Sequence, residues 1–164
     1  MPNVRITEVG PRDGLQSIRG VMSTPHKCSW IEQLAQAGLP EIEVASFVPA
    51  KLLPQMADAA EVVRFSTQLK HITISALVPN VMGAKAAFSA GVHKVVIPVS
   101  ASEAHSVANV RKTHAQMLQE VRTLATEWAS LAETGITTLC TPAEKAAFAP
   151  ITLGTSAEIV MCLS

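Results

Sequence analysis

Short apolar runs alternate with amphipathic segments along most of the chain. Apolar runs typical of β-strands occur at residues 4–7, 41–47, 72–77 and 94–99. Between them, residues 24–37, 57–67 and 81–90 have the apolar spacing of helices. Strands that are apolar almost throughout are typical of a parallel sheet covered on both faces. The repeated order of strand and helix therefore predicts an α/β fold, either a (β/α) barrel or a doubly wound sheet.

Two of the helices have clear sequence signals. Thr24 and Pro25 predict the start of the first helix, and Gly38 predicts its end. After Ser102, apolar residues recur at three- and four-residue steps, which predicts one long helix with all of them in the core. They are Val107, Val110, Met117, Leu118, Val121, Leu124, Trp128 and Leu131.

A charged run directly follows the first predicted strand. Residues 8–16 read Glu-Val-Gly-Pro-Arg-Asp-Gly-Leu-Gln, with Arg12 next to Asp13 and a glycine on either side. Ligands of α/β proteins bind at the carboxyl ends of the strands, where this run lies. A solvated turn is the alternative for such a pair. Glu43 lies between Ile42 and Val44 at the end of the second strand, in an otherwise apolar segment. Because an unpaired buried carboxylate is costly, we expect it to face Arg12 or a metal ion. An outward-facing strand charge is the alternative.

The run from Glu8 to Gln16 resembles the signature of the hydroxymethylglutaryl-CoA lyase family, within the pyruvate carboxyltransferase and HMGL-like superfamily. The similarity continues through residues 37–58, 77–80 and 90–109 and covers about residues 3 to 132. It implies a TIM barrel of (β/α) type. A complete barrel typically needs about 250 residues, so the 164 residues predict about four βα units of an incomplete one. The expected organisation is an amino-terminal half-barrel at residues 1–132 and an unmatched tail at residues 133–164.

The resemblance also implies a function and a set of site residues. The activity would be a metal-dependent carbon–carbon lyase that cleaves 3-hydroxy-3-methylglutaryl-CoA, or a similar 3-hydroxyacyl-CoA, to acetyl-CoA and acetoacetate, as in leucine degradation and ketone-body metabolism. Asp13 would be a ligand of Mg²⁺ or Mn²⁺, which prefer hard oxygen ligands. Arg12 would neutralise the developing enolate oxygen with its permanently charged guanidinium, and Glu43 is counted with both as catalytic.

Further polar residues are candidates for substrate contacts. We expect Gln16 to lie near the substrate, and Glu8 to act as an acceptor that holds the arginine or its loop. A structural salt bridge explains Glu8 equally well. Ser102 and Asn109 follow the fourth strand and could contact the substrate, although helix capping also explains the serine.

We expect the resemblance to the family to end at about Ala132. The family's His-x-His metal ligands, ligand asparagine and catalytic cysteine loop would all belong to the missing half, and a frame change or premature stop would produce such a junction. Residues 136–140 or 159–163 could be extended, and Thr141 could start a short helix. Two alternatives to the lyase stay open: a condensing acyltransferase or aldolase of the same superfamily, and a non-catalytic remnant that forms oligomers.

Composition narrows the class of protein further. Thirteen basic and thirteen acidic residues cancel, which favours neither nucleic acid nor a membrane surface as partner. No secretory signal or membrane-length apolar run is visible, and the cysteines Cys28, Cys140 and Cys162 fit a reducing compartment. We expect the cytoplasm or an organelle matrix. The exposed edges of a half-barrel predict a homo-oligomer or, alternatively, a tail segment that serves as a substitute strand.

Overall fold

The sheet has the sequential strand order of a barrel wall. A computed structural model of the chain describes residues 6–132 and 158–163, with the backbone alone for residues 127–132 and 158–163. Five strands follow one another in chain order, and all neighbours are parallel. A doubly wound sheet would instead reverse its strand order at one point. The described fold is therefore an incomplete (β/α) barrel, as expected. The strands are β1 (Thr7–Glu8), β2 (Glu41–Ser46), β3 (Thr73–Leu77), β4 (Lys94–Val99) and β5 (Glu158–Leu163).

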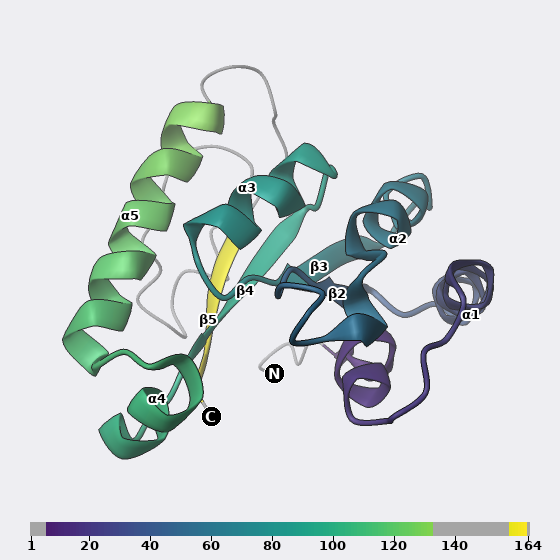
Figure 1. The fold of residues 1–164 in the computed structure, drawn as a ribbon. Helices are drawn as coiled ribbons and strands as arrows, with labels where there is room; N and C mark the ends of the chain where they lie inside the picture. Colours follow the sequence, from purple (N-terminus) through teal and green to yellow (C-terminus); the bar gives the residue numbers. More distant parts are fainter. Residues whose placement is uncertain (1–5, 133–157, 164) are drawn as a thin grey trace, which may run out of the picture.

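The helices follow the strands around the sheet. In Figure 1, α5, α3, α2 and α1 succeed one another from left to right. A single π-helical turn, η1, lies between β1 and α1, and a short 3₁₀ helix, η2, precedes α2. The elements are η1 (Gly10–Gly14), α1 (Thr24–Gln36), η2 (Pro54–Met56), α2 (Ala59–Ser66), α3 (Val81–Ser89), α4 (Glu103–Val110) and α5 (His114–Ala132).

The two faces of the sheet differ in chemistry. One face packs against the helices through fully buried aliphatic side chains such as Ile42, Ile74 and Ile97. Alternate residues of a strand point to opposite faces, so the other face includes Glu41, Glu43, Ser75 and Lys94. Lys94 Nζ lies 3.1 Å from Glu41 Oε1, and both side chains are buried. Buried charges are tolerated when they are paired in this way.

Several predicted boundaries are confirmed or shifted by a few residues. Gly38 ends α1 with a φ of +85°, a conformation that glycine adopts readily. Ser23, and not Thr24, is the residue that precedes the first turn of α1, and Pro25 lies in that turn. The described part of the first strand is Thr7–Glu8, because residues 4 and 5 of the predicted strand lie outside the described residues.

The single long helix predicted after Ser102 is wrong. The chain instead forms α4 and α5, separated where Arg111 adopts a left-handed conformation with φ 57°. The N–H of Arg111 still donates to the carbonyl oxygen of Val107 at 3.1 Å, and its left-handed backbone then turns the chain out of the helix. The expectation that all apolar residues of the stripe lie in the core is also wrong, since Val107 is 47% and Leu118 is 43% exposed. Met117, Val121 and Leu124 do lie in the core.

Part of the tail supplies a strand. β5 pairs with β4 along its whole length, from Lys94 opposite Glu158 to Val99 opposite Leu163. The predicted extended segment at 159–163 is therefore confirmed, and it occupies the edge of β4 as the expected substitute strand. The segments at 136–140 and 141–144 lie outside the described residues. A homo-oligomer remains a prediction.

Candidate active site

Arg12 and Asp13 lie on a tight turn at the carboxyl end of β1. The carbonyl oxygen of Val9 accepts hydrogen bonds from the backbone N–H groups of Arg12 (3.1 Å) and Asp13 (2.7 Å). Pro11 within the turn is buried. Backbone bonds of this kind fix the turn, so both charged side chains leave it in defined directions.

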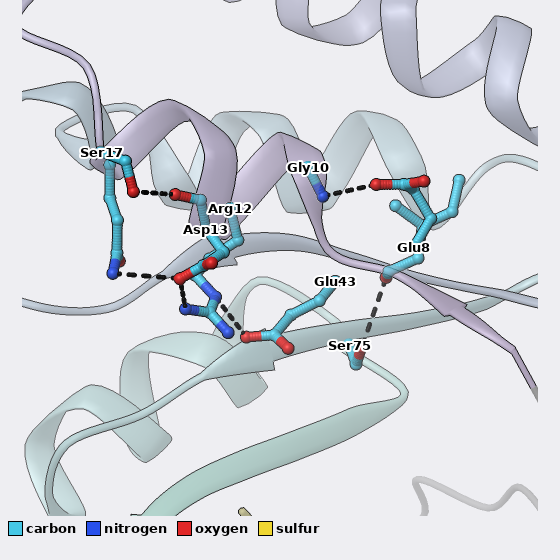
Figure 2. Close-up of polar contacts among 9 residues, drawn as sticks. Glu8, Gly10, Arg12, Asp13, Ser17, Glu43 and Ser75 are labelled. Atoms are coloured by element: carbon cyan, nitrogen blue, oxygen red, sulfur yellow. Dashed lines mark hydrogen bonds and ion pairs between the residues drawn. The ribbon is translucent and has the colours of Figure 1, made fainter. Parts of the chain in front are cut away.

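The side chain of Glu8 also holds this turn. Its carboxylate accepts a hydrogen bond from the N–H of Gly10 at 2.6 Å (Figure 2). A Cβ atom on Gly10 would lie 2.7 Å from Glu8 Oε1 and 3.2 Å from the ring of Trp30. Only glycine fits between these two side chains without a shift. The expectation that Glu8 holds the loop is met, and its bond goes to the backbone of the loop.

The guanidinium of Arg12 lies between two carboxylates, as Figure 2 shows. Its Nε donates to Glu43 Oε1 at 2.6 Å, and its NH1 group donates to Asp13 Oδ1 at 2.7 Å. The side chains of Arg12 and Glu43 are 12% and 4% exposed, whereas that of Asp13 is 54% exposed. The geometry predicted for Glu43 is therefore confirmed, because it faces Arg12. Burial raises the pKa of Glu43, and the bond and charge of Arg12 oppose that rise.

Asp13 is the outermost carboxylate of the group. Gln16 Nε2 approaches its Oδ1 at 3.4 Å, and Ser17 Oγ donates to its backbone carbonyl at 2.8 Å. Charge-assisted and neutral hydrogen bonds thus leave the carboxylate oriented but still reachable from solvent. An exposed, oriented carboxylate oxygen suits a hard divalent cation.

The described residues hold only part of a metal site. Asp13 offers one such oxygen, but in the described ranges no three His, Cys, Asp or Glu side chains come together in a way that could hold an ion. Mg²⁺ and Mn²⁺ are bound through several oxygen ligands, some of which are water or substrate. The donor chemistry of Asp13 fits such a cation as one ligand of a larger set.

The structure does not bring Ser102 and Asn109 into the cluster of Arg12, Asp13 and Glu43. Ser102 precedes α4, and its Oγ accepts from the N–H of His105 at 3.4 Å, which is the capping role considered for it. Asn109 lies exposed near the end of α4. Their contacts with a substrate stay predictions.

One polar residue next to the cluster was not expected from the sequence. Glu43 lies opposite Ser75 and Ser46 opposite Leu77, with a register shift between residues 43 and 45. Because of this bulge, Ser46 lies on the same face of the sheet as Glu43. Ser46 is fully buried, and within the described part of the chain its Oγ has no hydrogen-bond partner. A serine at the carboxyl end of an apolar strand was the available signal.

Comparisons with known proteins agree with this fold. The family model described as HMGL-like matches residues 3–152. The mitochondrial hydroxymethylglutaryl-CoA lyase of Macaca fascicularis is 48% identical over 107 residues, which are 65% of this chain and 33% of that protein. A solved HMG-CoA lyase from Bacillus subtilis superposes with a TM-score of 0.73 at 38% identity, covering 79% of this chain and 43% of that one. An HMG-CoA lyase from Acinetobacter baumannii, solved with coenzyme A and 3-methylmalate, gives 0.71 at 36% identity, with 75% and 40% covered.

Sequential parallel strands define a (β/α)-barrel protein. The Arg–Asp pair after the first strand lies where such barrels bind their ligands, at the carboxyl end of the strands. The chain belongs to the HMGL-like family, whose curated relatives here are hydroxymethylglutaryl-CoA lyases. It spans about a third of the length of those relatives, from 26% to 38%. The family model extends past Ala132, where we expected the resemblance to stop. Residues 133–157 lie outside the described part, so the domain boundary stays a prediction.

Proposed function

We propose that this chain carries the part of a hydroxymethylglutaryl-CoA lyase active centre that binds a divalent cation and stabilises the enolate. The observation that carries the proposal is the position of Arg12, held between the buried Glu43 and the exposed Asp13. The carboxylates of Glu43 and Asp13 would repel each other at this edge of the sheet without the guanidinium of Arg12 between them. The guanidinium therefore has a fixed place and keeps its charge next to a carboxylate that solvent and substrate can reach.

The reaction defines what these groups would do. Loss of a proton from the C3 hydroxyl of 3-hydroxy-3-methylglutaryl-CoA forms the ketone of acetoacetate. The electrons of the C2–C3 bond pass to the thioester as an enolate, which takes up a proton and becomes acetyl-CoA. Negative charge thus grows on the thioester oxygen, and a preorganised donor aimed at that oxygen lowers the barrier.

Arg12 is the donor suited to the enolate oxygen. Its planar guanidinium carries several N–H donors in a fixed geometry, and Glu43 accepts the hydrogen bond of its Nε. That bond fixes the plane of the guanidinium, so less side-chain entropy is lost when a substrate oxygen is bound. We assign Glu43 to orienting Arg12 and Gln16 to a substrate contact beside Asp13.

A divalent cation held by Asp13, when bound, would acidify the substrate hydroxyl and orient it. Asp13 is suited to this role because its side chain is the most exposed of the three charged groups. The other ligands would have to come from outside the described residues or from substrate and water.

An acyl-CoA is the substrate class that fits the comparisons. One similar HMG-CoA lyase structure contains coenzyme A together with 3-methylmalate, a small hydroxy diacid. Ser46 supports a polar acyl group at this place. Its buried hydroxyl has no hydrogen-bond partner among the residues that the structure describes, which is costly, and a bound substrate oxygen would accept its hydrogen bond. A condensing relative would use the same groups to form a carbon–carbon bond with another acyl acceptor. Assay of acetyl-CoA condensation with other keto acids, beside cleavage of 3-hydroxy-3-methylglutaryl-CoA, therefore distinguishes the two.

Mn²⁺ binding by the 164-residue chain tests the assignment of Asp13. We expect weak binding, measured by electron paramagnetic resonance of free Mn²⁺, that is lost in Asp13→Asn. The variant Glu103→Gln, which removes an exposed carboxylate from α4, should bind as the parent does. Binding that survives in Asp13→Asn would contradict the assignment.

Acetyl-CoA release from 3-hydroxy-3-methylglutaryl-CoA with Mg²⁺ or Mn²⁺ tests whether this chain is competent. Because the described ligand set is partial, we expect turnover more than tenfold below the enzyme median of about 10 s⁻¹. Turnover near that median would show that the remaining groups are supplied by residues outside the described ranges. A remnant without catalytic function would bind neither Mn²⁺ through Asp13 nor the acyl-CoA.

A further inference from the structure

Two charged residues at the starts of helices α1 and α2 depart from the local preferences of such positions. Lys27 lies in the first turns of α1, where the positive end of the helix dipole disfavours a cation, yet its side chain is 2% exposed. Asp58 directly precedes α2, where aspartate usually caps the helix, but it makes no capping bond there. Natural sequences break local rules mainly where function requires it.

These residues instead form one polar cluster with Thr24 and Gln55, here called the Lys27 cluster (Thr24, Lys27, Gln55 and Asp58). Lys27 Nζ donates to Asp58 Oδ1 and to the backbone carbonyl of Gln55, both at 2.5 Å. Thr24 Oγ1 donates to Asp58 Oδ2 at 2.7 Å. A buried ammonium needs such partners, since an unpaired one costs several kcal/mol.

The cluster contacts the loop that leaves the site. Gln55 Nε2 donates to the carbonyl oxygen of Ile18 at 2.6 Å, 37 residues away along the chain. Ile18 follows Gln16 and Ser17, which both bond to Asp13. Loop residues 18–21 are exposed. The segment from Gln16 to Ser23 is thus fixed by Ser17 at one end, by Gln55 in the middle and by the start of α1 at the other.

We propose that Lys27 is a positioning residue, which through Gln55 holds the loop of residues 15–23 so that Gln16 stays against Asp13. The claim on the loop stands on the contacts above. Its consequence for metal binding rests on the proposed function. Lys27 binds the backbone carbonyl of Gln55, the same residue whose side chain bonds to this loop.

Site-resolved amide hydrogen exchange on the full chain tests the positioning role. The reporters are the N–H groups of Asp13, Leu15 and Ser17, which donate to backbone carbonyls within residues 9–14. In Lys27→Met, which keeps the length of the side chain but removes its charge, we expect at least tenfold faster exchange at these three amides. The amides of β3 should keep their rates.

A matched control separates positioning from general stability. Lys94→Met also removes a buried lysine from an ion pair, with Glu41 at the amino ends of β4 and β2. It should lower the free energy of unfolding but leave the three reporter amides unchanged. Equal loosening of the loop in Lys94→Met, or wild-type exchange in Lys27→Met, would overturn the proposal.

Gln55→Ala gives a second route if Lys27→Met does not fold. It removes the contact with Ile18 and leaves the ion pair of Lys27 and Asp58 in place, so the same three amides should exchange faster. Unchanged exchange in this variant would also overturn the proposal.

Mn²⁺ titration then links the loop to the site. We expect binding at least fivefold weaker in Lys27→Met and Gln55→Ala than in Lys94→Met. If the parent chain binds no Mn²⁺ through Asp13, the proposed function fails, while the exchange rates still decide the role of Lys27.

Discussion

Arg12 Nε donates to Glu43 Oε1 over 2.6 Å, although the two residues are 31 positions apart in the chain. The contact joins the turn after β1 to the middle of β2. Both side chains are largely shielded from water, where a charge-assisted hydrogen bond is stronger than at the surface. The direction of the guanidinium in the site therefore depends on a neighbouring strand.

Glu43→Gln tests this dependence. The amide keeps the volume of the side chain but leaves Arg12 facing a neutral group, and we expect the free energy of unfolding to fall by about 1–3 kcal/mol. Urea denaturation measures the change, with Glu32→Gln on the exposed part of α1 as the control that should lie within about 0.5 kcal/mol of the parent. If Glu43→Gln were as stable as Glu32→Gln, the hydrogen bond between Glu43 and Arg12 would not hold Arg12 in place.

Gly10→Ala should disturb the turn that carries the site. The added methyl group would clash with Glu8 Oε1 at 2.7 Å and crowd the ring of Trp30. We expect a loss of about 1–3 kcal/mol and a shift of Trp30 fluorescence, measured in a Trp128→Phe background. Gly14→Ala is the matched control, because a Cβ atom there meets nothing within 4 Å. Equal effects of the two substitutions would rule out this explanation.

His93 should make the stability of the sheet depend on pH. Its Nδ1 accepts the N–H of Ile74 at 3.1 Å, and burial lowers the pKa of His93 below the ordinary value of 6.5. The unfolded chain therefore takes up a proton before the folded one, so stability is lost as pH falls from 6.5 through the lowered pKa. Against His93→Gln, the parent should lose stability across this window and keep it above pH 7. If the urea midpoints of the parent and of His93→Gln changed with pH in the same way, His93 would not be the source of the pH dependence.

Arg111→Gly should stabilise the junction of α4 and α5. The left-handed conformation at φ 57° is unfavourable for arginine, whereas glycine adopts it without steric penalty. We expect a gain of about 0.5–1 kcal/mol in the free energy of unfolding. Arg122→Gly, the same substitution inside α5, should instead lose about 1 kcal/mol. If both variants are destabilised, the backbone of Arg111 is not strained.

The charged cluster could be predicted from the sequence because its parts follow strands. Apolar runs at residues 41–47 and 94–99 identify buried parallel strands, and their carboxyl ends must lie on one edge of the sheet. Arg12 and Asp13 follow the first strand, while Glu43 is a charge within an apolar stretch of the second strand, where it needs a partner. Local rules of this kind also placed the end of α1 at Gly38.

Other features depend on contacts between residues far apart in sequence. The stripe of apolar residues after Ser102 resumes at Met117, seven residues after Val110, which is still a helical spacing. The packed structure reveals the left-handed turn at Arg111 that divides this region into α4 and α5. Ser46 lies on the same face of the sheet as Glu43 because of a bulge in β2. Strict alternation of side chains along the strand would have placed Ser46 on the opposite face.

The sequence by itself determined the strand and helix order and the presence of a charged turn at the carboxyl end of β1, since apolar periodicity and turn residues act over a few positions. The tertiary structure decided that β5 lies beside β4 and that Lys27, Gln55 and Asp58 meet. A buried ammonium can lower its desolvation cost with any carboxylate that the fold brings near. Which carboxylate that is depends on the packing of α1 against α2. Local sequence preferences instead predict that Asp58 caps α2, and they disfavour a lysine near the start of α1.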